Sequence, residues 1–282
     1  MRLATVIHDA RPSVGIVRDG GVLPLTGPAR EFGSMREIAA GGAPTTARIT
    51  AWAERQPAAA YRSLAEVALG PAVPDPGAIY TIGHNYRSPG TPREAAPSRP
   101  LIYGKAANSV SGHGSTVAWD RTLTDNVDAE VELCVVIGAR ATAVSASQAM
   151  DHVFGYTCIN DISSRDEWLD GDQWLLGKSM PGFCPVGPWI VTSDELGPED
   201  LPLGCTINGA AIQDGRTSHM RSSIPDLIAY LSLHLTLEPG DLIATGTPHR
   251  LAQPPGPARR LRAGDEVTVW IEGIGELTNF IA

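Results

Sequence analysis

The sequence predicts an α+β, β-rich fold: a mixed β-sandwich or roll with few helices, preceded by a small α+β domain. Short runs rich in β-branched and aromatic residues, separated by Gly, Pro, Asn and Asp, recur from residue 78 to the end. Only one segment of that region, residues 223–235, has the apolar spacing of a longer helix. A proline-rich stretch separates this region from the first 70 or so residues.

The first part of the chain reads as a small unit of its own. Strands are predicted at residues 2–8, 13–17 and 22–24, with an Asp-Gly hairpin signal in "RDGG". "SMREIAAGG" and "TTARITAWAERQ" have helical composition, and the glycine pair ends the first of them. Three prolines in "LGPAVPDPGA" continue neither a helix nor a central strand. We therefore expect a domain of residues 1–72 and a second of residues 73–282.

The second domain alternates strands with turns. Its helix at 223–235 places Ile224, Leu227, Ile228 and Leu231 on one face. A hairpin is expected around Asn208-Gly209. The remaining strands are predicted at 78–83, 101–104, 126–138, 154–160, 188–192, 241–246 and 265–272.

Composition excludes several classes of protein. Thirty-one acidic residues against 22 basic ones give a net charge of −9, which argues against a nucleic-acid partner. The apolar runs are too short to span a bilayer, and the first residues lack a signal-peptide pattern, so we expect a cytoplasmic protein. The four cysteines show no metal-binding spacing and are expected to be reduced and buried.

One strand combines carboxylates with an apolar run. In "NVDAEVELCVVIG", Glu130 and Glu132 share a face, about 6.6 Å apart along the backbone. Both faces become apolar further along, so the two charges would enter a buried environment, where a cation would compensate them. The alternative is that both lie on a solvated face. Asp161 ends another strand and Lys178 lies in an apolar stretch. A third carboxylate would complete a hard, all-oxygen site for Mg²⁺ or Mn²⁺.

Six segments in order resemble the fumarylacetoacetate hydrolase superfamily over residues 78–282. The resemblance implies a mixed β-sandwich roll, usually dimeric, with a small N-terminal domain. It implies that Glu130, Glu132 and Asp161 are metal ligands and that Lys178 lies near the metal. The segments are "DAEVELCVVIG", "GYTCINDISSRD", "GKSMPGFCPVGPWIV", "INGAAIQDGRT", "LEPGDLIATGTP" and "GDEVTVWIEGIGEL".

The same resemblance suggests substrate-binding positions. Thr247, which follows Gly246, matches a substrate-contacting position, although a plain turn residue is the alternative. Tyr86 and Lys105 fall on pocket positions, where each could instead only frame the site. Arg165 and Asp166 are interpreted as supporting structure.

Among the histidines, His84 is the first candidate for a general base. The alternative is a packing role at a strand end. His113 and His249 are weaker candidates.

The sequence departs from the family at one motif. Many hydrolases and decarboxylases of the family carry "NYxxHxxE", whose His and Glu activate water. Here "NYRSPGTPREAAP" places Pro89 and Pro92 at those positions, so the dyad is absent. The segments "NYRS" and "KAANSVSGHG" resemble the branch of 2-hydroxyhepta-2,4-diene-1,7-dioate isomerases and decarboxylases, which lacks the dyad.

We therefore expect a divalent-metal-dependent enzyme, in a homodimer, acting on a 2-oxo acid or its 2-hydroxy-dienoate enol. Mg²⁺ or Mn²⁺ is the expected cofactor, with Ca²⁺ as a substitute. The metal would stabilise an enolate, and the missing dyad favours isomerisation, tautomerisation or decarboxylation. One alternative is a C–C hydrolase of the fumarylacetoacetate or acylpyruvate type. The other is a protein that binds metal and ligand without turnover.

Overall fold

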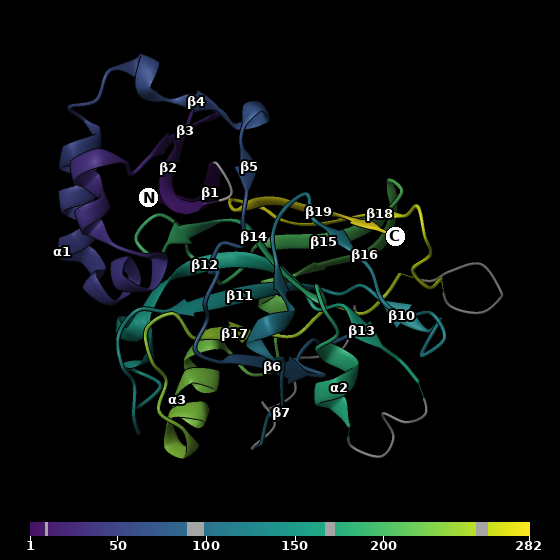
Figure 1. Cartoon of the computed structure of the whole chain (residues 1–282). Helices are drawn as coiled ribbons and strands as arrows, with labels where there is room; N and C mark the ends of the chain where they lie inside the picture. Colours follow the sequence, from purple (N-terminus) through teal and green to yellow (C-terminus); the bar gives the residue numbers. More distant parts are fainter. Residues whose placement is uncertain (9–10, 89–98, 167–172, 252–258) are drawn as a thin grey trace.

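The computed structural model describes residues 1–8, 11–88, 99–166, 173–251 and 259–282 (Figure 1). Two sheets dominate this part of the chain. The larger has 12 strands, with the main order β4-β3-β2-β1-β14-β12-β11-β17-β6-β7, while β5 pairs with β1 and β8 with β14. Its strands are β1 Arg2–His8, β2 Arg11–Arg18, β3 Gly21–Pro24, β4 Arg62–Ser63, β5 Ala68–Leu69, β6 Ile79–Gly83, β7 Leu101–Gly104, β8 Val110–Ser111, β11 Val131–Ile137, β12 Val153–Asn160, β14 Cys184–Thr192 and β17 Leu242–Ala244.

The second sheet has five strands and packs across β11, β12 and β14 of the first. Its order is β16-β15-β18-β19-β9, and a separate pair is formed by β10 with β13. This arrangement confirms the predicted β-rich α+β fold. The strands are β9 Thr116–Val117, β10 Val127–Asp128, β13 Ser163–Ser164, β15 Pro202–Ile207, β16 Ala210–Arg216, β18 Glu266–Ile271 and β19 Gly275–Ile281.

Helices are few, as predicted. The helices α1 Met35–Ala53, α2 Trp174–Lys178 and α3 Ile224–His234 belong to the described residues. In α1, Gly42 has non-helical torsions (φ 52°), so the predicted interruption at the glycine pair is present as a kink. Ser223 and Asp226 form a capping box at the start of α3, whose predicted apolar face is buried. None of the helices in the described ranges has both the length and the apolar composition needed to cross a bilayer.

The N-terminal strands join the large sheet directly. β1 pairs antiparallel with β14, with Leu3 opposite Ile190. Helix α1 lies beside the N-terminal strands (Figure 1). Its apolar side chains, Ile38 and Ile49 among them, belong to the same core as these strands. The domain boundary near residue 72 stays a prediction, and the sheet continues across it.

The strand β11 is buried on both faces, which explains its unbroken apolar sequence. Leu133 and Val135 belong to the core between the two sheets. Cys134 and Val136 belong to the core shared with α1. All four cysteines of the chain are free and buried, as predicted.

One local prediction was wrong, and some elements were missed. The strand predicted over residues 126–138 is two strands, because β10 ends at Asp128 and pairs with β13, and β11 begins only at Val131. Glu130 lies in the irregular two-residue connection between them, directly before β11. Helix α2 and strand β19 were not predicted, since five residues of helix are too few for a periodic signal and β19 is interrupted by polar residues.

Candidate metal centre and surrounding pocket

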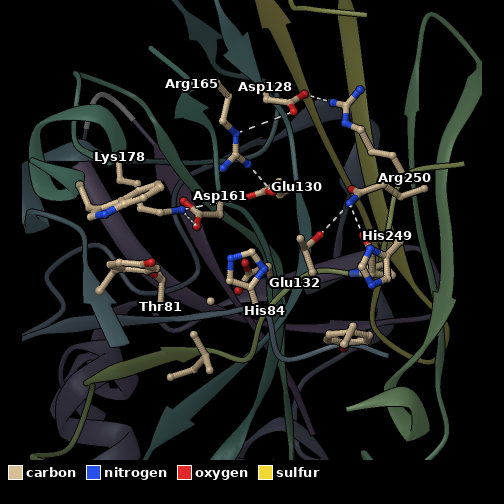
Figure 2. A pocket seen from close by; sticks show the side chains of 18 of the residues that line it. Thr81, His84, Asp128, Glu130, Glu132, Asp161, Arg165, Lys178, His249 and Arg250 are labelled. Carbon is tan, nitrogen blue, oxygen red and sulfur yellow. Dashed lines mark hydrogen bonds and ion pairs between the residues drawn. The ribbon is translucent and has the colours of Figure 1, made fainter. Parts of the chain in front are cut away.

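A pocket of about 450 Å³ opens where the end of β6, the start of β11, the end of β12 and helix α2 meet the loop after β17. This volume is typical of small-molecule sites. Four carboxylates and several basic side chains line it, together with two histidines (Figure 2). The pocket thus holds most of the residues that the sequence singled out.

The three predicted metal ligands come together at its base. One potential ligand atom from each of Glu130, Glu132 and Asp161 lies within 4.8 Å of the others. The antiparallel register of β11 and β12 places Val131 opposite Asn160, so Asp161 emerges beside Glu130. The Asp161 amide donates to the Glu130 carbonyl at 2.9 Å, which fixes that approach.

Two buried lysines hold Asp161. Lys105 Nζ donates to Asp161 Oδ1 at 2.6 Å and to the Ile162 carbonyl at 3.0 Å. Lys178 Nζ donates to Asp161 Oδ2 and, at 3.0 Å, to Ser163 Oγ. Burial would raise the pKa of Asp161, but the two ammonium groups outweigh it and hold that pKa below its ordinary value. Burial would lower the pKa of Lys178, yet Asp161 and Glu130 raise it above the ordinary value.

Glu132 lacks such a partner. It is buried, and among the described residues no basic side chain forms an ion pair with it. The backbone N–H of Gly246 donates to its Oε2 at 2.8 Å. Burial and the charge of Asp161 raise the pKa of Glu132 well above its ordinary value. A buried carboxylate beside two others, without its own counter-charge, fits a bound cation.

Gly246 has a structural reason to be glycine. Its φ is +96°, and a Cβ there would lie 2.8 Å from Asn85 Cβ and 2.9 Å from the Ile82 carbonyl. The backbone N–H of Gly246 contacts Glu132. The predicted contact of Gly246 with a substrate stays a prediction.

The raised pKa of Glu132 predicts how metal-free stability changes with pH. Above the ordinary pKa of 4.5, the unfolded chain releases this proton while the folded chain retains it, so folding stability falls as pH rises until the folded pKa is passed. Glu132→Gln removes this loss. We expect the variant, with chelator present, to be more stable than the parent by about 1–3 kcal/mol at pH 7–8, the usual cost of a buried polar group without full partners.

Urea unfolding at several pH values measures this difference. The difference between variant and parent should shrink toward pH 4.5. A Glu132→Gln variant that is less stable than the metal-free parent at pH 8 would contradict the assigned electrostatics.

A second group of charges surrounds Asp128 at the pocket wall. Arg250 contacts its Oδ1, and Arg260 Nη1 lies 3.1 Å from its Oδ2. Arg165 lies 3.9 Å from the same Oδ2 and also contacts Glu130 Oε1 (Figure 2). Sequence reasoning gave no site role to Asp128, Arg250 or Arg260. The only signals were the position of Asp128 in the alternating acidic run and that of Arg250 three residues after Thr247.

The other predicted residues take different places. His84 is exposed, lines the pocket and has a positive φ of 54° at the end of β6. Tyr86 is buried at the pocket wall, and burial together with Glu132 raises the pKa of its hydroxyl. Lys105 lies behind Asp161 with a fully buried side chain and is not among the described residues that line the pocket. Its observed role is to hold Asp161.

Thr247 is fixed by a residue that sequence reasoning missed. Its Oγ1 donates to the Val131 carbonyl and accepts from Gln213 Nε2, both at 2.8 Å. Gln213 Oε1 in turn accepts from the Val131 amide at 3.0 Å. Thr247 and Gln213 both line the pocket, so this bridge ties its wall to the start of β11.

The remaining histidine candidates differ in position. His249 lines the pocket, with Nε2 3.1 Å from Ser88 Oγ. His113 lies elsewhere, where its Nδ1 accepts from the Thr278 amide at 3.2 Å, and it is not among the described pocket residues. Pro89 and Pro92, at the positions of the family dyad, lie outside the described residues.

Comparison with known proteins places this site in a family. Residues 78–282 match the family described as Fumarylacetoacetate (FAA) hydrolase C-terminal. A fumarylacetoacetate hydrolase from Exiguobacterium antarcticum is 30% identical with a TM-score of 0.86, over 100% of this chain and 99% of that chain. A 2-hydroxyhepta-2,4-diene-1,7-dioate isomerase from Mycobacterium marinum is 30% identical with a TM-score of 0.78, over 100% and 98%.

A third solved structure carries ligands. Maleylpyruvate hydrolase from Sphingobium sp. SYK-6, in complex with manganese (II) ion and pyruvate, is 26% identical with a TM-score of 0.81, over 100% of this chain and 99% of that chain. These neighbours are enzymes with different reactions. With the family match over residues 78–282 and the acidic triad in one pocket, the chain belongs to the fumarylacetoacetate hydrolase family.

Proposed function

We propose that this protein is a divalent-metal-dependent enzyme that acts on a 2-oxo acid, or on its 2-hydroxy-dienoate enol, through a stabilised enolate. Isomerisation, tautomerisation or decarboxylation is the favoured outcome. The observation that carries the proposal is the convergence of Glu130, Glu132 and Asp161 within 4.8 Å, beside Lys178, in one pocket.

The three carboxylates suit a hard cation. Glu130, Glu132 and Asp161 would hold Mg²⁺ or Mn²⁺, with Ca²⁺ as a substitute, because oxygen-only sites prefer these ions to zinc. The manganese in the similar maleylpyruvate hydrolase supports this choice. When bound, such a cation supplies Lewis-acid stabilisation for the negative charge that develops on the 2-oxo oxygen.

The chain's own residues supply the remaining charge and proton chemistry. Because its pKa is raised, Lys178 stays protonated at neutral pH and provides positive charge beside a developing enolate. Tyr86 likewise keeps its hydroxyl proton, so it would donate a hydrogen bond to the substrate and not accept a proton from it. His84, exposed in the pocket, is the candidate that exchanges a proton with a substrate carbon.

A substrate screen tests the proposal. Purified protein would be incubated with oxaloacetate, acylpyruvates and 2-hydroxymuconate-type acids, with Mg²⁺, Mn²⁺ or chelator. We expect metal-dependent turnover of at least one compound. Tight binding of oxalate or pyruvate without turnover of any of them would instead support a non-catalytic ligand-binding protein.

Glu132→Gln tests the metal site separately from turnover. The change keeps the shape of the side chain but removes one charge, so affinity for the divalent ion should fall at least tenfold, about 1.4 kcal/mol. Calorimetric titration with Mn²⁺ measures this. Asp200→Asn, which alters an exposed carboxylate paired with Arg216 outside the pocket, is the matched control. Equal affinity in parent and Glu132→Gln would exclude Glu132 as a ligand.

A C–C hydrolase of the fumarylacetoacetate or acylpyruvate type is the second candidate. The similarity to two hydrolases, from Exiguobacterium and Sphingobium, favours it. It requires a group that activates water, and the described pocket offers His84 and His249 as candidates.

A further inference from the structure

The segment "INGAAIQDGRT" supplies the pocket with a buried glutamine, Gln213. It includes β16, the edge strand of the five-stranded sheet. In the pairing of β16 with β15, Gln213 lies opposite Cys205, and Ala211 lies opposite Thr206. Ile212 is therefore an extra residue, a β-bulge. Consecutive side chains normally point to opposite faces of a strand, but here Ile212 and Gln213 are both buried. The bulge thus turns Gln213 inward, with 2% of its surface exposed.

The side of β11 that faces β17 ends its regular pairing before the acidic triad. β17 pairs with β11 from Cys134 to Val136. The Thr245 amide still donates to the Leu133 carbonyl at 2.9 Å. The chain then turns at Gly246, whose φ is +96°. The next backbone groups on this side of β11, those of Val131, therefore lie beyond the strand that covers the rest.

Two side chains take the place of a strand at Val131. Gln213 Oε1 accepts from the Val131 amide at 3.0 Å, and Thr247 Oγ1 donates to the Val131 carbonyl at 2.8 Å. Gln213 Nε2 donates to Thr247 Oγ1 and to the Pro248 carbonyl, both at 2.8 Å. The amide of Gln213 is thus used within the protein, so this residue acts through its neighbours and not by donating to a ligand.

The position of Val131 makes this clamp relevant to the acidic triad. One of its two peptide groups joins it to Glu130 and the other joins it to Glu132. On the opposite side, the Glu130 amide donates to Asn160 Oδ1 at 3.2 Å, and its carbonyl accepts from the Asp161 amide. Carboxylates whose oxygens lie within 4.8 Å of one another repel without a cation. A backbone held from both sides keeps them together.

We propose that Gln213 is a positioning residue which, together with Thr247, clamps the backbone of Val131 and so presets Glu130 and Glu132 for a divalent cation. This rests on the proposed function, which assigns the two glutamates to a metal ion. Groups that hold metal ligands in place without touching the metal typically contribute about 10- to 100-fold to metal affinity. The five-stranded sheet thereby supplies part of the support for a site whose carboxylates come from the larger sheet.

Calorimetric titration with Mn²⁺, without any substrate, tests the clamp. Gln213→Met keeps the length of the side chain but removes its hydrogen bonds, and should weaken Mn²⁺ binding about tenfold or more. Thr247→Val keeps the shape of the side chain but removes the hydroxyl, and should weaken it about tenfold. Thr247→Ser retains the hydroxyl and should restore affinity to within about threefold of the parent.

Thr157→Val is the matched control. Thr157 is buried in β12, and its Oγ1 donates to the Gly187 carbonyl at 3.1 Å. The variant therefore loses the same kind of bond as Thr247→Val, but away from Val131, and its Mn²⁺ affinity should equal that of the parent. Thermal unfolding of each metal-free variant measures stability separately. Thr247→Val carries the test alone if Gln213→Met does not fold.

A double variant tests whether the two side chains act as one unit. Because Gln213 and Thr247 hold the same residue, Gln213→Met combined with Thr247→Val should weaken Mn²⁺ binding by less than the product of the two single effects. A double variant that shows the full product would mean that the two act separately, which contradicts the shared clamp.

The other outcomes separate this inference from the function on which it rests. Parental Mn²⁺ affinity in Gln213→Met and Thr247→Val, even with lowered unfolding temperatures, would reduce the clamp to a structural role and leave the proposed function standing. Thr247→Ser binding as weakly as Thr247→Val would overturn the role of the hydroxyl. If the parent protein binds neither Mn²⁺ nor Mg²⁺, the proposed function fails, and the clamp fails with it.

Discussion

Replacing Asp161 with Ala should destabilise the metal-free protein by about 3–5 kcal/mol, the usual effect of removing one partner from a buried ion pair. The side chains of Lys105, Asp161 and Lys178 are 0%, 1% and 6% exposed, so both cations would remain buried without Asp161, and Lys178 would keep only the longer contact with Glu130 Oε2, 4.0 Å away. Urea unfolding with chelator present would measure the change.

Two further variants make this result specific. Asp200→Ala removes an exposed carboxylate paired with Arg216 and should leave the unfolding midpoint unchanged. Asp161→Ala combined with Lys178→Met removes one of the two buried cations that Asp161 neutralises and should recover part of the lost stability. If Asp161→Ala unfolds at the same urea concentration as the parent, the lysines are not held by Asp161 as described.

Asp161 and Glu132, two members of the acidic triad, affect the stability of the metal-free protein in opposite ways. Asp161 has a depressed pKa, so the stability it contributes is present above its ordinary pKa and is lost as pH falls. Glu132 has a raised pKa, and its contribution has the opposite sign. Removing the carboxylate at one position should therefore destabilise the metal-free protein, and at the other stabilise it. This pattern is typical of a site in which basic side chains neutralise one carboxylate, while another is left for a bound ligand.

The sequence predicted the acidic triad because each member has a local signal. Glu132 opens an apolar strand and Asp161 ends another, and antiparallel pairing of β11 with β12 brings them together. The break between β10 and β11 was not predicted, because two residues of irregular backbone leave no change in periodicity. Glu130 nevertheless lies at the site, because its backbone carbonyl accepts a hydrogen bond from the Asp161 amide.

The group of arginines around Asp128 at the pocket wall could not be predicted in the same way. Asp128 lies 122 residues before Arg250 and 132 before Arg260, and neither arginine belongs to a strand or helix whose pattern would orient it. The two arginines reach Asp128 only because of the path that the folded chain takes after β17. Lys105 illustrates the same point, since only the folded structure shows that it supports Asp161 from behind and does not face the pocket.

The last prediction concerns the water-activating dyad, whose positions are taken by Pro89 and Pro92. The protein should exchange the C3 protons of 2-oxobutanoate with deuterium faster than it hydrolyses acetylpyruvate, by about 10²-fold or more. Exchange needs a stabilised enolate and one base, for which His84 is the candidate in the pocket. Hydrolysis also needs an activated water, and a missing general base typically costs 10² to 10⁴ in rate.

NMR spectroscopy in deuterated buffer follows both compounds in one sample with Mg²⁺, and metal ion without protein corrects for spontaneous exchange. His84→Ala should slow exchange, whereas His249→Ala tests whether the ring 3.1 Å from Ser88 Oγ has taken over water activation. Glu132→Gln should reduce both reactions, because each depends on the same charge stabilisation at the base of the pocket. Acetylpyruvate cleavage as fast as exchange, and abolished by either histidine substitution, would reverse the proposed order and identify that histidine as the base that replaces the dyad.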